Sequence, residues 1–360
     1  MTLPESEEKN MDKIRLIIPT SIPHTAQIIT GFLMLKEQGW EVEIQNRSGN
    51  RCAPFYGLPA LLVEYRGKRL FYDVWDGYQD LPDMLLGLKN SDFYFKRSFS
   101  PEKNRELFLE DSGRMYPLGF NYYVTHPGNP TNEPLWKAAA RMLRGKTPAR
   151  YFVPEVFEGS VDTNCGTPPK ILFLAGLWGR EDWLGDDPAN SEREAVSAMR
   201  VEIIRAMRRA FGSAFIGGIN DCALSRKLAP DLIVPRSLTE RRRYLNVMHG
   251  CDICIGSAGL HGSIGWKTGE YVAAAKAIVH EEMNYSVTGD FREGVNYLSF
   301  RTPEECVEAV AKLVESPQQL QAMKRANATY YQKYLRPDML VKNTLRVVDG
   351  VLDLKTPADY

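Results

Sequence analysis

The sequence has few cysteines, no net charge and no long apolar run. Its 360 residues include six scattered cysteines, which is typical of reduced thiols in a cytosol and not of a disulfide scaffold. Lys plus Arg and Asp plus Glu each total 45, so the basic excess of a dedicated nucleic-acid binder is missing. The longest apolar runs, such as residues 171–174, are far shorter than the roughly 20 residues of a membrane span.

The first residues are polar and acidic, which is unlike a signal or transit peptide. No segment stands out as a basic amphipathic helix. We therefore expect a cytoplasmic protein with at most peripheral contact at the inner face of a membrane, and no nucleic-acid partner. The sequence leaves the oligomeric state open.

The length and the order of predicted elements indicate two α/β domains. An apolar strand at 13–19, a helix at 25–38 and a strand at 40–45 give a β-α-β opening. Residues 159–169 are rich in Pro, Gly and small polar residues and are predicted as a linker. A strand at 170–176 then starts a second β-α-β series.

Further elements follow from the same patterns. Residues 60–65 and 69–75 flank a short turn and predict a hairpin. We also expect strands at 92–96, 214–219, 252–255 and 277–280, and helices at 81–89, 134–143, 193–211, 239–249, 268–275, 303–315, 317–334 and 337–352.

The segment 256–270 is the first candidate site, because ligands of open parallel sheets bind beyond the carboxyl ends of strands. It contains five glycines and leads into a helix, so many backbone N–H groups are free to approach a phosphate. Lys267 adds a point charge for a diphosphate. Glu270 either accepts hydrogen bonds from ribose hydroxyls or simply complements the helix dipole.

Other strand-end loops carry single candidates. His24 follows the first strand and is either a general base or a residue that caps the next helix. Arg180 follows the first strand of the second half and either contacts phosphates or is a solvated loop residue. Asp76 either contacts an acceptor or shapes a turn, and Arg97 is a candidate for acceptor or phosphate contacts.

Three other patterns do not predict a functional site of the kind that they first suggest. The arginines at 241–243 are predicted to be a solvated helix face. Cys251 and Cys254 lack a second cysteine pair, so no metal site is predicted. No G-x-G-x-x-G follows either first strand, which argues against a nicotinamide oxidoreductase.

A family resemblance rests on residues 267–279, which read KTGEYVAAAKAIV. This run resembles the K-x-x-E-Y-L-A-A-G-K-P-V-V segment of GT-B-fold glycosyltransferases, in particular those like retaining family 4. Residues 302–317 are similar to the C-terminal end of that family, and residues 170–176 look like its entry strand. Pro23 and His24, followed by a helix, Gln-Gly and a strand, resemble the opening of many GT-B enzymes.

The resemblance implies a GT-B fold, with two Rossmann-like β/α/β domains facing a central cleft. Residues 13–158 would form the acceptor-binding domain and 170–335 the nucleotide-sugar-binding domain. Residues 1–12 would be a flexible N-terminus, and 336–360 a terminal helix packing back on the N-terminal domain.

The implied activity is glycosyl transfer of the hexosyltransferase type, with a role in polysaccharide biosynthesis. A nucleoside-diphosphate sugar would be the donor, and a glycan, lipid-linked saccharide or small molecule would supply the hydroxyl acceptor. No metal or other cofactor is required. The donor-binding residues would be Arg180, Ser257, Gly259, His261, Gly265, Lys267, Glu270 and Tyr271. The acceptor-binding residues would be His24, Asp76 and Arg97, and the catalytic residues His24 and Glu270.

The sequence also departs from the family pattern. Gly262 occupies the position of a first glutamate, with His261 adjacent, and Arg180 is displaced by three residues. A retaining or an inverting outcome therefore stays open, as do the donor base, the sugar and the acceptor. The alternatives are a GT-B-like nucleotide-sugar epimerase or hydrolase, and a non-catalytic nucleotide-sugar-binding protein.

Overall fold

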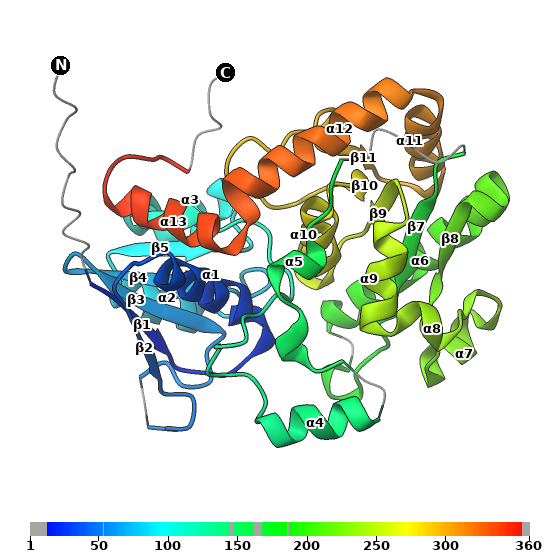
Figure 1. Ribbon diagram of the computed structural model, residues 1–360. Helices are drawn as coiled ribbons and strands as arrows, with labels where there is room; N and C mark the ends of the chain where they lie inside the picture. Colours follow the sequence, from blue (N-terminus) through cyan, green and yellow to red (C-terminus); the bar gives the residue numbers. More distant parts are fainter. Residues whose placement is uncertain (1–12, 53, 145–146, 162–167, 186, 355–360) are drawn as a thin grey trace, which may run out of the picture.

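The computed structural model describes residues 13–52, 54–144, 147–161, 168–185 and 187–354. It contains two α/β domains, side by side in Figure 1, with the N-terminal sheet in blue and cyan and the C-terminal sheet in green and yellow. The predicted flexible segment 1–12, most of the predicted linker (162–167) and the last six residues lie outside the described ranges.

The N-terminal sheet has the strand order β2-β1-β3-β4-β5-β6. Its strands are β1 (Ile14–Ile18), β2 (Val42–Asn46), β3 (Ala60–Tyr65), β4 (Lys68–Asp73), β5 (Phe93–Lys96) and β6 (Met115–Pro117). The predicted hairpin is confirmed: β3 runs antiparallel to both β1 and β4. Arg66 and Gly67 both have positive φ, as a two-residue hairpin turn requires. The other pairings are parallel, so β1, β4, β5 and β6 end at the same edge.

The C-terminal sheet is entirely parallel, with the order β11-β10-β9-β7-β8. Its strands are β7 (Ile171–Ala175), β8 (Phe215–Ile219), β9 (Ile253–Gly256), β10 (Ala277–Glu281) and β11 (Leu298–Phe300). The first strand, β7, lies between β8 and β9, so the chain changes direction across the sheet at this point. In doubly wound sheets the ligand crevice opens there, beyond the carboxyl ends of the strands.

The helices comprise those that the sequence predicts, with some shifts at their ends, and four short ones at residues 101–108, 154–157, 223–228 and 236–239 that it does not predict. They are α1 (Ala26–Glu37), α2 (Leu81–Lys89), α3 (Pro101–Phe108), α4 (Leu135–Leu143), α5 (Pro154–Phe157), α6 (Pro188–Phe211), α7 (Ala223–Leu228), α8 (Arg236–Thr239), α9 (Arg241–His249), α10 (Trp266–Ala273), α11 (Pro303–Glu315), α12 (Pro317–Tyr330) and α13 (Pro337–Val348). The sequence pattern predicts that α6 begins at residue 193, but the helix begins five residues earlier. The Asp187 side chain accepts a hydrogen bond from the Ala189 N–H (2.8 Å) and Pro188 takes the first position, which together stabilise this earlier start.

Two segments cross between the domains. Residues 118–157 precede the predicted linker, yet Phe120, Tyr122 and Phe157 lie in the hydrophobic core of the C-terminal half. After α12, a π-helical turn (Tyr331–Leu335) leads into α13, which packs against α1 (Figure 1, red and blue). The Tyr72 hydroxyl lies 2.6 Å from the Thr344 hydroxyl, so α13 is also tied to the N-terminal sheet.

The predicted fold class is confirmed, because two Rossmann-like sheets with flanking helices form the GT-B arrangement. None of the helices within the described ranges combines the length and the apolar composition that a bilayer crossing requires.

Candidate functional site

A pocket of about 280 Å³ opens beyond the carboxyl ends of β7 and β9, where the C-terminal sheet changes direction. The predicted donor-binding residues Ser257, Gly265, Lys267 and Glu270 all line it. The other lining residues come from the ends of β7 and β9 and from neighbouring helices: Phe173, Leu174, Ala175, Gly176, Arg200, Arg241, Ile255, Gly256, Trp266 and Thr268.

The first turn of α10 forms one wall of this pocket. Gly265 precedes the helix in an extended conformation, and Trp266, Lys267 and Thr268 follow as its first residues. The first N–H groups of a helix have no partner inside the helix, and they carry the positive end of its dipole. This wall is therefore suited to an anionic group.

Lys267 adds a buried amine to the same wall. Its Nζ donates a hydrogen bond to the Leu174 carbonyl oxygen at the end of β7 and lies 4.9 Å from the centre of the Tyr244 ring. Burial lowers the pKa of Lys267 to about 8, with the Glu270 carboxylate opposing this shift. The amine is thus mostly protonated at neutral pH, and an incoming phosphate would stabilise that charge.

Glu270 is almost completely buried, at 1% exposure, and is paired with Arg241. The two guanidinium nitrogens donate to its two carboxylate oxygens at 2.8 and 3.0 Å. Burial on its own would lower the pKa of the Arg241 guanidinium. The attraction of the Glu270 carboxylate is stronger than this effect, so the pKa is raised. The Arg241 side chain also lies over the rings of Phe152 and Phe157, at 5.6 and 5.3 Å.

The prediction that arginines 241–243 form a solvated face is wrong for Arg241, whereas Arg242 and Arg243 are exposed as predicted. A sequence signal was present: Arg241–Arg243 occupy the first turn of α9, where the helix dipole disfavours cations. Such a placement indicates that other contacts hold the side chain, and here Glu270 provides them.

Arg200 is a second pocket residue that sequence reasoning missed. It comes from the middle of α6 and donates to the Ser257 hydroxyl (3.1 Å) and to the Gly176 and Ala258 carbonyls (2.8 and 3.0 Å). These bonds join the loops after β7 and β9 across the pocket. No local pattern identifies this arginine, since its partners lie 24 to 58 residues away.

The rest of the glycine-rich loop turns toward the N-terminal domain. The Gly259 N–H donates to the Ser263 carbonyl at 2.7 Å, which closes the loop. His261 has a φ of 60°, and its carbonyl accepts a hydrogen bond from the Tyr285 hydroxyl at 2.7 Å. A side chain at Gly77 would lie 2.8 Å from the His261 Cβ, so the two domains touch at this point.

Four of the predicted donor-binding residues do not line this pocket: Gly259, His261, Tyr271 and Arg180. Tyr271 is fully buried in the hydrophobic core behind the pocket. Arg180 lines a separate hollow between α6 and α7, where it donates to the Gly185 carbonyl at 3.0 Å.

The predicted acceptor residue His24 contacts Trp266, which lines the pocket. The centres of the two rings are 4.6 Å apart, and Tyr123 stacks on Trp266 at 5.8 Å. Burial and the nearby Arg97 lower the pKa of His24, with Asp76 opposing. The imidazole is therefore neutral at pH 7, which is the form that a general base needs.

Asp76 and Arg97 form a second contact between the domains. An Arg97 nitrogen lies 2.5 Å from an Asp76 carboxylate oxygen, and the same guanidinium donates to the Ile264 carbonyl of the glycine-rich loop at 2.8 Å. Behind them, the buried Lys96 amine lies 2.8 Å from the Asp73 carboxylate. The three predicted acceptor residues thus lie at one edge of the N-terminal sheet, where His24 contacts Trp266 and Arg97 contacts Ile264 of the predicted donor loop.

A smaller polar hollow of about 180 Å³ lies beside His24. Its walls combine residues 21–26 with residues 123–141 and Ala149, and Tyr123 belongs to both this hollow and the stack on Trp266. Its polar lining includes Ser21, Tyr123, Thr125, Asn129, Thr131, Asn132, Glu133 and Arg141.

Within the described ranges, no three His, Cys, Asp or Glu side chains gather in a way that could hold a metal ion. Cys251 and Cys254 are buried, and burial raises the pKa of both thiols.

No protein-family model and no curated protein matches the chain. Similar solved structures include the HepE protein of Anabaena in complex with UDP (10% identity, 93% of this chain and 98% of that chain, TM-score 0.45). A sucrose-phosphate synthase of Thermosynechococcus elongatus is similar at 10% identity over 90% of this chain and 91% of that one, with a TM-score of 0.39. A putative UDP-N-acetylglucosamine 2-epimerase of Listeria monocytogenes is similar at 9% identity over 97% and 100%, with a TM-score of 0.41. Identities and TM-scores this low support no conclusion about a reaction.

Proposed function

We propose that this protein is a metal-independent glycosyltransferase that moves a sugar from a nucleoside-diphosphate sugar to a hydroxyl acceptor. The observation that carries the proposal is the pocket beyond β7 and β9. Its lining combines the first turn of α10 and the three cations Lys267, Arg200 and Arg241 with one carboxylate, Glu270, which is paired with Arg241. Such an excess of positive charge suits a diphosphate.

In this proposal the donor diphosphate lies against the first turn of α10, near Lys267. The Glu270–Arg241 pair then holds the nucleotide ribose, since a carboxylate accepts hydrogen bonds from two neighbouring hydroxyls. The acceptor occupies the polar hollow beside His24, on the far side of Trp266. A neutral His24 takes the acceptor proton if the reaction inverts. If it retains, the leaving diphosphate takes that proton.

A thermal-shift screen with UDP, GDP, ADP, TDP and CMP tests the donor half of the proposal. A ligand that binds the folded state raises the unfolding midpoint by mass action, so the correct nucleotide stands out. Lys267→Gln is expected to abolish the shift. Lys227→Gln, in the separate hollow between α6 and α7, is the matched control and leaves it unchanged. No shift with any nucleotide at millimolar concentration would refute the donor site.

Incubation of the matching nucleotide sugar with and without acceptors tests the reaction. Transfer to a hydroxyl compound supports the proposal, whereas release or conversion of the sugar without an acceptor identifies a hydrolase or epimerase. Binding without turnover identifies a non-catalytic binder. The anomeric configuration of the product, read by NMR, distinguishes retention from inversion. For an inverting reaction, His24→Asn is expected to abolish turnover. His249→Asn is the control because the His249 ring lies 2.9 Å from the Val156 carbonyl oxygen and lines neither the pocket nor the polar hollow.

A further inference from the structure

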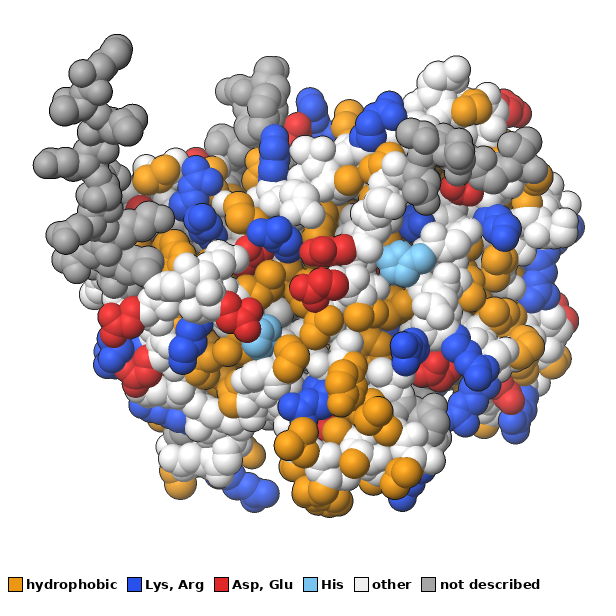
Figure 2. Space-filling view, in the orientation of Figure 1, with side chains coloured by type: hydrophobic (Ala, Val, Ile, Leu, Met, Phe, Trp, Pro, Cys, Tyr) orange, Lys and Arg blue, Asp and Glu red, His pale blue; other side chains and the backbone are white. Residues whose placement is uncertain are grey.

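Helix α4 exposes an unusual number of large apolar side chains. It projects from the lower edge of the molecule in Figure 1, and only Ala138 among its residues is buried. Leu135, Trp136 and Leu143 are 71%, 69% and 90% exposed, and Met142 is 56% exposed. Hydrophobic side chains gather at the same edge in Figure 2. A contiguous exposed apolar patch of this kind marks an interaction surface.

The charges of this helix are segregated from its apolar residues. Leu135, Ala139 and Leu143 recur every four residues and share one stripe, with Trp136 beside it. The cations Lys137, Arg141 and Arg144 recur on the opposite side, and residues 134–144 contain no acid. The sequence prediction that no basic amphipathic helix is present is therefore wrong, because α4 has both an apolar and a cationic face.

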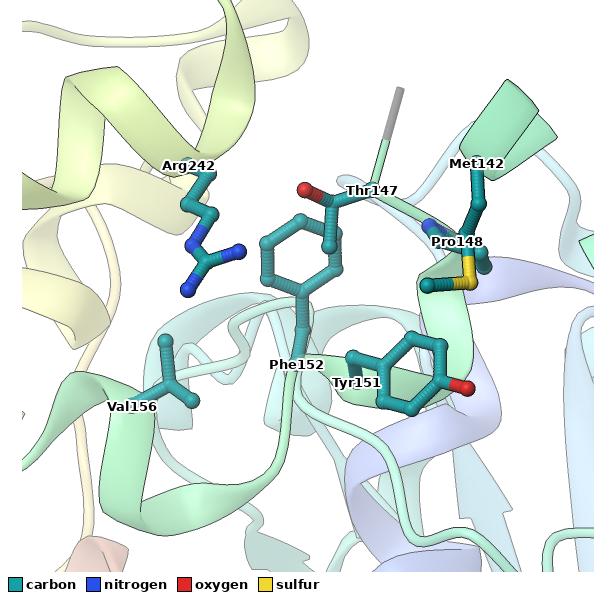
Figure 3. A pocket seen from close by; sticks show the side chains of 7 residues that line it. All are labelled: Met142, Thr147, Pro148, Tyr151, Phe152, Val156 and Arg242. Carbon is teal, nitrogen blue, oxygen red and sulfur yellow. The ribbon is translucent and has the colours of Figure 1, made fainter. Parts of the chain in front are cut away.

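A hollow of about 450 Å³ continues the apolar surface toward the body of the protein. Figure 3 shows Met142 of α4 and Arg242 of α9 on opposite sides of it, with the ring of Phe152 between them. Tyr151, which is 49% exposed, lies next to Met142 in this view. The hollow thus combines apolar walls with a cation at its rim.

We propose that α4 and this hollow dock the protein on the surface of an anionic lipid bilayer. The stripe of Leu135, Trp136 and Leu143 enters the boundary between headgroups and acyl chains, where tryptophan is favoured. Lys137, Arg144 and Arg242 face the lipid phosphates. Charge complementarity selects this occupant: a second copy would bring two acid-free cationic helices together, whereas an anionic bilayer attracts them. The proposal goes beyond the glycosyltransferase assignment and does not require the donor pocket.

Co-sedimentation of the full-length protein with vesicles tests this inference. The vesicles are pure phosphatidylcholine, or phosphatidylcholine with about one third phosphatidylglycerol. We expect binding to the anionic vesicles and much weaker binding to the neutral ones. Trp136→Ser with Leu143→Ser is expected to weaken binding at least tenfold. Lys137→Gln with Arg144→Gln is expected to weaken it by roughly 25-fold, at about fivefold per cation near an anionic surface.

Trp183→Ser is the matched control, because Trp183 is 80% exposed in the C-terminal domain and lies outside α4; its binding should equal that of the unchanged protein. Circular dichroism confirms that each variant is folded. Absence of binding to anionic vesicles, or equal loss in the Trp183 control, would overturn the proposal. So would a dimer in sedimentation velocity that the α4 variants dissociate, since a second copy would then cover this face. Competition by soluble glycerol phosphate would point to a headgroup site and also overturn it.

Discussion

The buried Glu270–Arg241 pair gives a prediction whose size follows from the structure. Glu270→Gln keeps the shape of the side chain but removes the charge that compensates Arg241. Breaking a buried ion pair from one side costs about 3–5 kcal/mol. The Arg241 side chain retains 28% exposure, so water screens part of that loss and we expect about 2 kcal/mol. The double variant Arg241→Gln with Glu270→Gln leaves no uncompensated charge and should recover roughly 1 kcal/mol of this loss.

Urea unfolding measures these changes in the free energy of unfolding, provided that the slope m stays constant. Asp221→Asn is the control, because it breaks an exposed pair with Arg226 and should leave the midpoint unchanged. Nucleotide affinity should fall in the single and the double variant alike, which separates binding from stability. A double variant that is no more stable than Glu270→Gln would show that the carboxylate does not compensate the charge of Arg241 and would refute the reasoning.

Three further predictions concern Lys267, His280 and Gly31. The pKa of Lys267 is about 8, so nucleotide affinity should fall as pH rises through that value and the amine loses its charge; a calorimetric pH series checks this, and Lys267→Arg, which stays charged, should remove the dependence. Burial lowers the pKa of His280 to about 4. As pH falls, the unfolded chain therefore binds a proton at His280 at a higher pH than the folded chain does. The free energy of unfolding should drop by about 3 kcal/mol between pH 6.5 and 4. Urea titrations at each pH measure this drop, and His280→Gln should abolish it. A Cβ on Gly31 would lie 2.2 Å from the Pro337 carbonyl oxygen, so Gly31→Ala should cost about 2 kcal/mol in the same assay, whereas Gly49→Ala, with open space around it, should cost almost nothing.

The elements of this fold were predictable wherever a local pattern defines them. Buried parallel strands such as β7 and β9 appear as short apolar runs, and α11 begins and ends at the predicted residues because Thr302 and Pro303 mark its start. Lys267 and Glu270 were found in the same way, since the glycine-rich loop that precedes them follows a strand. These signals lie within a few neighbouring residues.

What sequence reasoning missed depends on distant contacts. Arg200 reaches the pocket only because α6 packs beside the loops after β7 and β9. Tyr271 adjoins Glu270 in the chain, yet the helix turns its side chain into the core, because neighbours on a helix point about 100° apart. Whether the apolar side chains of α4 are exposed or buried likewise depends on the rest of the fold. The residues of the helix alone do not determine it.

The contact between α13 and α1 joins two helices that are synthesised at very different times. Leu340, Val341 and Leu345 of α13 lie in the same core as Ile28 and Phe32 of α1. During synthesis, the apolar face of α1 that packs on α13 therefore stays exposed until residues 337–348 have been made. A nascent chain that stalls before residue 337 would expose this apolar face, and we expect such a chain to bind chaperones.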